Sequence, residues 1–224
     1  MSVQSRADGP HGQPANADAY RRTFVRQVHS LVALGYARLD RPSFQRAQEP
    51  AITGELVRLI RSVIDDRNSP TNSWAHRYAV HDDPPQNVRD LKGKERPRVD
   101  IEMELTQRGR HPRFQFEAKK FPVNRKDAVG EYVGDSGLGC FISGMYAETH
   151  NDAGMLAYVQ NDKITDWIEK VRERLVKQRE SCELIGDWEK AEFIKDIEHC
   201  FCSVHRRPRV GRPMTIYHTF LSIN

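Results

Sequence analysis

Apolar positions recur with a helical period in several parts of the chain. Residues 20–35 carry such a stripe, and the glycine at its end predicts a stop for the first helix. A second helix is predicted after Pro50, because apolar residues line one side of residues 52–63 and a proline fits the first turn. Further helices are predicted over residues 164–178 and 188–197.

Strand-like patterns occupy much of the remaining chain. In residues 98–105 every second side chain is apolar, which is the period of a half-buried strand. Residues 114–121 form a second such segment, and the turn-forming residues 107–112 between them predict a β-hairpin. A short strand is expected over residues 78–80, within the loop-rich stretch 65–97. Three further strands are expected in the apolar runs 154–159, 200–205 and 215–223.

This order of elements predicts an α/β fold with a mixed central sheet flanked by helices. The chain has 224 residues, which is enough to bury a core in one domain without disulfides or structural metals. Residues 1–18 are rich in Gly, Pro, Ser, Gln, Asn and Asp and are expected to form a flexible tail. The single domain is therefore expected to span residues 19–224, with its glycine-containing segment 130–144 partly helical.

Composition narrows the class of protein. The net charge of +4 permits contact with nucleic acid without requiring it. No run of apolar residues is long enough for a transmembrane helix, and residues 1–18 lack the apolar centre of a secretory signal, so a cytoplasmic protein without a membrane partner is expected. The four cysteines are expected to be reduced thiols, and Cys200 and Cys202 to pack on one face of a strand, because their spacing is not that of zinc ligands.

The predicted hairpin carries the candidate catalytic side chains. Residues i and i+2 of a strand share a face, so Glu117 and Lys119 are expected to project together. Asp100 can reach the same face from the neighbouring strand, where opposed side chains lie about 5 Å apart. Two carboxylates and the carbonyl of Ala118 suit Mg²⁺, which prefers oxygen ligands. A lysine beside them can orient or deprotonate water or stabilise negative charge, which phosphodiester hydrolysis requires.

A structural explanation competes with this chemical one. The same acid-x-lysine triplet occurs at residues 90–92, in a loop with no apolar alternation, so the triplet alone is a weak signal. Glu117 and Lys119 differ because apolar residues surround them, and buried charges are costly unless they are paired or bind a metal. An ion pair between these two side chains on the solvent face of an edge strand is the alternative.

The segments 98–100 and 116–119, preceded by a helix with a carboxylate, resemble the PD-(D/E)xK superfamily of restriction endonucleases, Holliday-junction resolvases and repair nucleases. The resemblance covers roughly residues 49–159 and implies a restriction-endonuclease-like core of the order αβββαβ. Val99 stands where the family has a proline. The resemblance implies that the helix carboxylate is Glu49 or Glu55, which spacing does not separate.

The resemblance further implies a metal-dependent endonuclease that hydrolyses DNA, with RNA as an open alternative, in restriction or antiviral defence. Asp100, Glu117 and the Ala118 carbonyl would hold Mg²⁺ or Mn²⁺, and Lys119 would act on the attacking water. A homodimer or a companion defence protein is an expected partner. The competing hypothesis is a catalytically silent module with this fold that binds nucleic acid or docks a partner in a larger defence complex.

Basic residues near the proposed site and in a loop between the last two strands are expected to contact phosphates: Arg96, Arg98, Lys120, Arg206, Arg207 and Arg209. A solvated loop is the alternative for the arginines of the second group. Tyr132 is expected to pack in the core, with a contact to the proposed site as the alternative. Trp167 and Trp188 are expected in the core.

Overall fold

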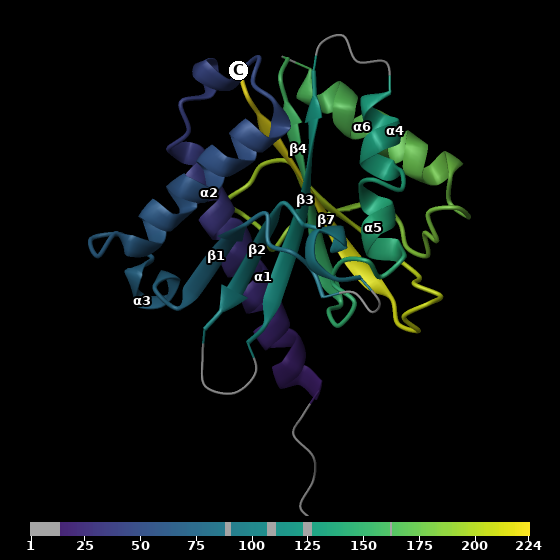
Figure 1. The fold of residues 1–224 in the computed structure, drawn as a ribbon, viewed down its shortest axis with the longest axis horizontal. Helices are drawn as coiled ribbons and strands as arrows, with labels where there is room; N and C mark the ends of the chain where they lie inside the picture. The colour runs from purple at the N-terminus through teal and green to yellow at the C-terminus, as the bar shows by residue number, and fades with distance from the viewer. Residues whose placement is uncertain (1–13, 88–90, 107–110, 123–126, 162) are drawn as a thin grey trace, which may run out of the picture.

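The computed structural model describes residues 14–87, 91–106, 111–122, 127–161 and 163–224. Within these residues the chain forms a seven-stranded mixed sheet with the order β1-β2-β3-β4-β7-β6-β5 (Figure 1). The pairs β3–β4 and β4–β7 are parallel, and the other neighbours are antiparallel. The strands are β1 (Tyr78–Asp82), β2 (Ile101–Leu105), β3 (Arg113–Phe121), β4 (Asp152–Val159), β5 (Glu189–Lys190), β6 (Cys200–His205) and β7 (Met214–Ser222).

Helices cover both faces of the sheet, as an α/β fold requires (Figure 1). The helices are α1 (Pro14–Ala37), α2 (Glu49–Asp65), α3 (Asn72–Ala75), α4 (Ala128–Val133), α5 (Leu138–Ile142) and α6 (Ile164–Lys177), with 3-10 turns η1 (Arg41–Phe44) and η2 (Gly93–Glu95). One core lies between the sheet and α1 and α2, and the other between the sheet and α4, α5 and α6. Alternate residues of β4 supply the two cores, with Leu156 facing the first and Met155 the second.

The first two helices differ from expectation at Gly35. The predicted stop at this glycine is wrong, because α1 continues to Ala37. A Cβ atom on Gly35 would lie 2.6 Å from Cγ1 of Ile60, so the glycine lets α1 and α2 approach closely instead of ending the helix. The apolar stripe of α2 is buried as predicted, which includes Ile52, Leu56 and Val63.

Two other segments near the ends of the chain also depart from the predictions. The helix expected over residues 188–197 is wrong: β5 lies there and pairs with β6, and turns follow it. Ala191 and Ile194 are buried at helical spacing, but the amide of Ala191 donates to the carbonyl of Cys200 at 3.0 Å, so strand pairing prevails over the local period. In the expected tail, α1 already begins at Pro14, and residues 1–13 lie outside the described residues.

A chain of buried hydrogen bonds joins α4 to the last two strands. The Nδ1 atom of His205 lies 2.6 Å from the carbonyl of Cys182, which can only accept, so this nitrogen carries the proton. Ser203 then donates to Nε2 of His205 at 2.7 Å and accepts from Nε2 of His218 at 2.7 Å. The Tyr132 hydroxyl donates to Nδ1 of His218 at 3.0 Å. Tyr132 therefore packs inside the protein, and both histidines are neutral.

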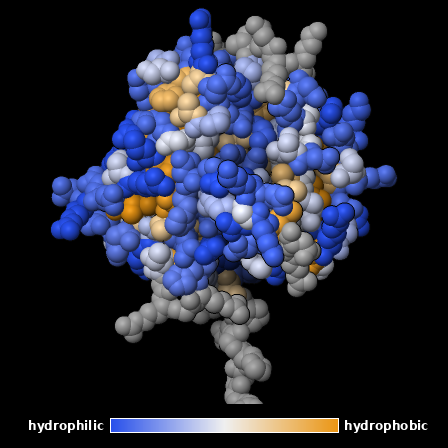
Figure 2. All heavy atoms as spheres, viewed as in Figure 1, coloured by the Kyte–Doolittle hydropathy of each residue, from blue (hydrophilic) through white to orange (hydrophobic). Residues whose placement is uncertain are grey.

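The face in Figure 2 is covered mostly by hydrophilic residues, with hydrophobic ones showing only in separate small areas. The large hydrophobic side chains that are exposed among the described residues come from different elements: Tyr20, Leu91, Met145, Val176 and Ile185. No helix in the described part of the chain is both long and apolar enough to span a bilayer.

The contact between β3 and β4 predicts a steric effect at Gly154. A Cβ atom there would lie 2.2 Å from Cδ1 of Phe116, so Gly154→Ala should reduce the free energy of unfolding in urea by about 1–3 kcal/mol. Gly54→Ala is the matched control, because the nearest atom to its added Cβ is 3.9 Å away and alanine favours a helix interior. Equal destabilisation by the two changes would contradict this packing.

Buried histidines predict a loss of stability in acid. Burial lowers the pKa of His205 to about 4, and that of His29 to about 4, from 6.5. Between pH 4 and pH 6.5 the unfolded chain binds more protons than the folded one. Each histidine therefore lowers the free energy of unfolding by up to about 3 kcal/mol as the pH falls from 6.5 to 4. The His205→Gln variant should lose less stability than the wild type between pH 7 and 5 in chemical denaturation. An unchanged pH dependence would contradict the burial of a neutral His205.

Candidate active site

The site begins where β2 separates from β3. The two strands pair only from Ile101↔Phe116 to Glu104↔Arg113. The preceding residues turn instead toward the segment after β1, where the amide of Asp83 donates to the carbonyl of Asp100 at 3.0 Å. The expected first strand, over residues 98–105, therefore begins at Ile101, and Asp100 lies at the point of separation.

Two carboxylates occupy the edge of β3 that this separation leaves open. The amide of Ala118 donates to Oδ2 of Asp100 at 2.7 Å, and the amide of Lys120 donates to Oε2 of Glu49 at 2.8 Å. These bonds satisfy backbone donors that the neighbouring strand does not reach. Glu49 can do this because it is the first residue of α2, whose N-terminus lies beside β3.

Glu117 and Lys119 project toward the same side of β3, as their spacing predicts. The Lys119 ammonium donates to Oε1 of Glu117 at 2.5 Å and to the carbonyl of Ala118 at 2.9 Å. Its Nζ atom also lies 3.6 Å from Oε1 of Glu49. Residues from β3 and α2 thus contact one ammonium group.

Glu117 is the most perturbed acid of this group. Its side chain is almost fully buried, and its Oε2 atom has no hydrogen-bond partner among the described residues. Burial and the negative charge of Asp100 raise the pKa of Glu117 to about 8, although Lys119 opposes the shift. A buried oxygen without a partner, on a carboxyl with a raised pKa, can hold a proton or accept a cation.

The neighbouring groups shift in directions that burial and charge explain. Burial raises the pKa of Asp100 and that of Glu49, more than the bonds to Ala118 and Lys120 and the charge of Lys119 lower them. Burial alone would lower the pKa of Lys119, but the charges of Glu117, Glu49 and Asp100 reverse this and raise it. Lys119 is therefore a charged ammonium at neutral pH.

Further hydrogen bonds position the start of β2, and no periodic pattern in the sequence indicated them. The Tyr146 hydroxyl donates to the carbonyl of Arg98 at 2.6 Å, and the Tyr146 amide donates to the carbonyl of Cys140 in α5. Gln115 donates to Glu102 at 2.6 Å. The expectation of a half-buried strand is incomplete, because Glu102 is buried as well as the apolar residues.

The two candidate helix carboxylates lie in different surroundings. Glu49 reaches Lys119 and Lys120, as described above. Glu55 instead forms an ion pair with Arg58, one turn further along α2, with a shortest distance of 2.6 Å. The structure therefore brings Glu49, but not Glu55, to the group around Asp100 and Glu117.

The basic residues expected near the site are held by neighbouring groups. Arg96 donates to Asn87 at 2.9 Å, and Arg98 forms an ion pair with Asp83 at 2.6 Å. Lys120 donates from Nζ to Gln48 at 2.5 Å. Among these three, Arg98 keeps about half of its side chain exposed and is the most accessible to a ligand.

The arginines between β6 and β7 lie two strands away from β3, and they are not equivalent. Arg206 pairs with Glu183 at 3.2 Å. Arg207 is 1% exposed and donates to the carbonyls of Ala147 at 2.9 Å and His150 at 2.6 Å. Burial lowers its pKa to about 10. The expectation that Arg207 contacts phosphate is corrected, because its guanidinium holds the loop together inside the protein.

Comparisons with known proteins add no identification. No family model matches the chain, no curated protein matches it and no solved structure matches it. Among the described residues, no group of three or more His, Cys, Asp or Glu side chains is arranged closely enough to hold a metal ion. The case for a site therefore rests on Asp100, Glu117, Lys119 and Glu49 themselves.

The electrostatics predict a titration that can be measured for Glu117. Its carboxyl ¹³C resonance should titrate with a midpoint near 8 in metal-free protein. Asp100→Asn should lower the midpoint by removing a like charge, and Lys119→Met should raise it further. Because the folded pKa exceeds the unfolded one, this group's contribution to stability is lost as pH rises from about 4.5 to about 8.

Glu55→Gln is the control for this titration, because Glu55 pairs with Arg58 away from Glu117. It should leave the midpoint of Glu117 unchanged. A midpoint for Glu117 near 4.5, insensitive to Asp100→Asn, would contradict the burial and coupling of these two acids.

Proposed function

We propose that the chain is a metal-dependent nuclease that hydrolyses phosphodiester bonds of DNA. The observation that carries the proposal is the convergence of Asp100, Glu117 and Glu49 on Lys119, with one oxygen of Glu117 buried and unbonded. Three carboxyl groups beside a single ammonium, with Glu117 the most deeply buried of them, favour binding of a divalent cation.

The donors suit the metal that the resemblance implies. The candidate ligands are carboxylate oxygens of Asp100 and Glu117 and the carbonyl of Ala118, all of them hard oxygen donors that Mg²⁺ or Mn²⁺ accepts. The unbonded Oε2 atom of Glu117 supports this fit. When bound, such an ion would supply Lewis-acid polarisation of the phosphate and a lower pKa for water.

The chain's own groups have separable roles in the proposal. Lys119 carries a proton at neutral pH, so it orients water and stabilises negative charge on the phosphate rather than acting as a base. Glu49 holds Lys119 from the side and receives the amide of Lys120. Arg98, beside Asp100 and half exposed, is placed to contact a backbone phosphate.

The order of elements supports the same assignment. Apart from the short helices α3 and α5, the order α2, β1, β2, β3, α4 and β4 is compatible with the αβββαβ core that the PD-(D/E)xK resemblance implies. Glu49 opens the helix, Asp100 precedes β2, and Glu117 and Lys119 lie on β3. A role in restriction or antiviral defence, with a homodimer or companion protein, is part of this proposal.

A specific observation favours the competing function of a silent nucleic-acid-binding or docking module. Asp100 and Glu49 already accept hydrogen bonds from backbone amides, and Lys119 already donates to Glu117 and to the Ala118 carbonyl. In this arrangement the two carboxylates act as hydrogen-bond acceptors for the open edge of β3. They would have to exchange these bonds to bind a metal.

Metal-dependent nicking of supercoiled plasmid by the full chain tests the proposal. Asp100→Asn, Glu117→Gln and Lys119→Met should each reduce the rate by about 100-fold or more, because the first two remove proposed metal ligands and the third removes the ammonium that stabilises negative charge on the phosphate. The far-ultraviolet circular dichroism spectra should be unchanged. Glu55→Gln and Lys92→Ala are matched controls outside the group and should keep the wild-type rate.

Titration of Glu117 with and without Mg²⁺ separates the two functions. A nuclease site predicts that Mg²⁺ lowers the pKa of Glu117, because a nearby cation favours the carboxylate. Gel-shifted DNA without cleavage, together with a Glu117 pKa that ignores Mg²⁺ and Mn²⁺, would instead establish the silent module. Cleavage of RNA but not DNA by the same residues would correct the substrate alone.

A further inference from the structure

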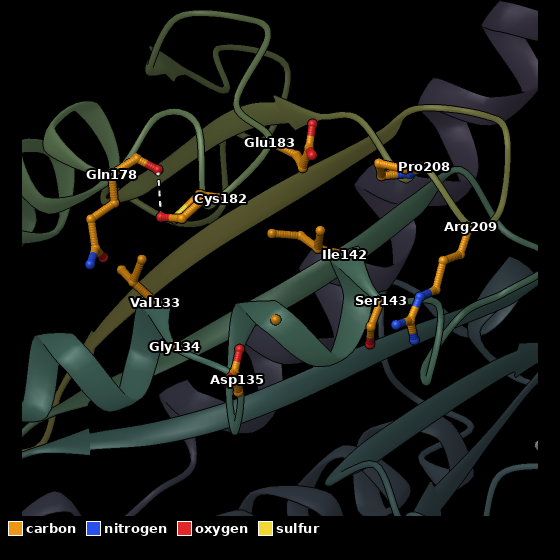
Figure 3. Close-up of a pocket in the computed structure, with 12 residues that line it drawn as sticks. Val133, Gly134, Asp135, Ile142, Ser143, Gln178, Cys182, Glu183, Pro208 and Arg209 are labelled. Carbon is orange, nitrogen blue, oxygen red and sulfur yellow. Dashed lines mark hydrogen bonds between the residues drawn. The ribbon is translucent and has the colours of Figure 1, made fainter.

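A cavity of about 530 Å³ lies between α4, α5, the turns after α6 and the loop between β6 and β7 (Figure 3). Its walls combine apolar side chains, including Val133 and Ile142, with the polar side chains of Ser143 and Gln178. This volume and this mixture are typical of sites for small organic ligands. Asp100, Glu117, Lys119 and Glu49 do not line the cavity.

Arg209 supplies an available positive charge at this cavity. It extends from the loop toward Ser143 at one end (Figure 3). Arg206 pairs with Glu183, Arg207 donates to the carbonyls of Ala147 and His150, and Arg212 donates to the carbonyl of Glu148. For Arg209, by contrast, no hydrogen bond or ion pair with another described residue is seen. A guanidinium in this state is suited to bind a phosphate or carboxylate in a bidentate manner.

Asp135 supplies an available negative charge at another part of the same cavity. It lies in the turn between α4 and α5, and its side chain points into the cavity (Figure 3). No hydrogen bond or ion pair of its carboxylate is seen within the described residues, and Arg209 is beyond ion-pair distance. The other acid in the lining, Glu183, is held by Arg206.

The cavity is therefore complementary to a ligand with two poles and an apolar middle. Arg209 would bind an anionic group, and the Asp135 carboxylate, which only accepts hydrogen bonds, would bind hydroxyl or amino donors. The apolar side chains of Val133, Ile142 and Pro208 would contact a planar ring between them. A 5′-mononucleotide has these three parts in one molecule of suitable size.

We propose that this cavity binds a mononucleotide, with the phosphate at Arg209 and the sugar hydroxyls or base amino group at Asp135. The site is distinct from the carboxylate group at β3, and the proposal does not depend on nuclease activity. The charged groups that recognise the ligand come from the turn between α4 and α5 and from the loop after β6, and the turns that carry Ser181 and Cys182 close the wall. The amide of Cys182 and the hydroxyl of Ser181 donate to the carbonyl of Gln178 at 2.9 Å and 3.1 Å, and these bonds hold that wall in place.

Calorimetric titration of the full chain with adenosine 5′-monophosphate tests the proposal. Arg209→Ala should weaken binding by about 10-fold to 100-fold, as expected for a charge-assisted hydrogen bond, and Asp135→Asn should weaken it less. Arg212→Ala is the matched control, because Arg212 belongs to the same loop, donates to the carbonyl of Glu148 and does not line this cavity. It should bind the nucleotide as the wild type does.

Fragments of the nucleotide test each part of the assignment. Adenosine should bind more weakly than the monophosphate, and Arg209→Ala should not change its affinity. Ribose 5-phosphate should also bind more weakly than the monophosphate, because it lacks the base. Amide shifts in the wild-type NMR spectrum should concentrate at residues such as Val133, Ile142 and Ser181. No binding at millimolar nucleotide would overturn the proposal, as would binding that ignores Arg209→Ala. Inorganic phosphate that binds as tightly as the nucleotide would also overturn it, because a simple anion site would then suffice.

Discussion

Backbone amides at the open edge of a strand need hydrogen-bond acceptors, and this requirement shapes the centre of the molecule. The chain pairs with β3 only from Ile101 onward, because the segment before Ile101 stays with the residues that follow β1. Asp100 and Glu49 supply the missing acceptors to the amides of Ala118 and Lys120. The geometry of the sheet therefore brings Asp100 to this edge, and the N-terminus of α2 brings Glu49 to it.

Gathering acids at this edge has an electrostatic consequence. Glu117 and Asp100 come close enough for each charge to affect the other's pKa, while burial withholds the water that would screen them. One ammonium, that of Lys119, offsets only part of the negative charge. The arrangement caps the open edge of β3, which the proposed docking module would keep, whereas the proposed nuclease would exchange some of these bonds to bind a cation.

The arginines show how tertiary structure divides similar residues among different tasks. Arg206, Arg207 and Arg209 lie within four residues of one loop. Burial commits Arg207 to backbone carbonyls, and a nearby acid commits Arg206, while Arg209 faces a cavity without a partner. A basic cluster in a sequence thus indicates charge near a surface without indicating which charge is available.

The local pattern of the sequence determined that β2 and β3 form, the apolar stripes of α2 and α6, and the shared side of Glu117 and Lys119, because these depend on period alone. It did not predict β5, since pairing with β6 overrides the helical spacing of Ala191 and Ile194. Spacing also could not choose between Glu49 and Glu55. That choice depends on where the first turn of α2 meets β3, a contact between residues 71 positions apart, which only the tertiary structure decides.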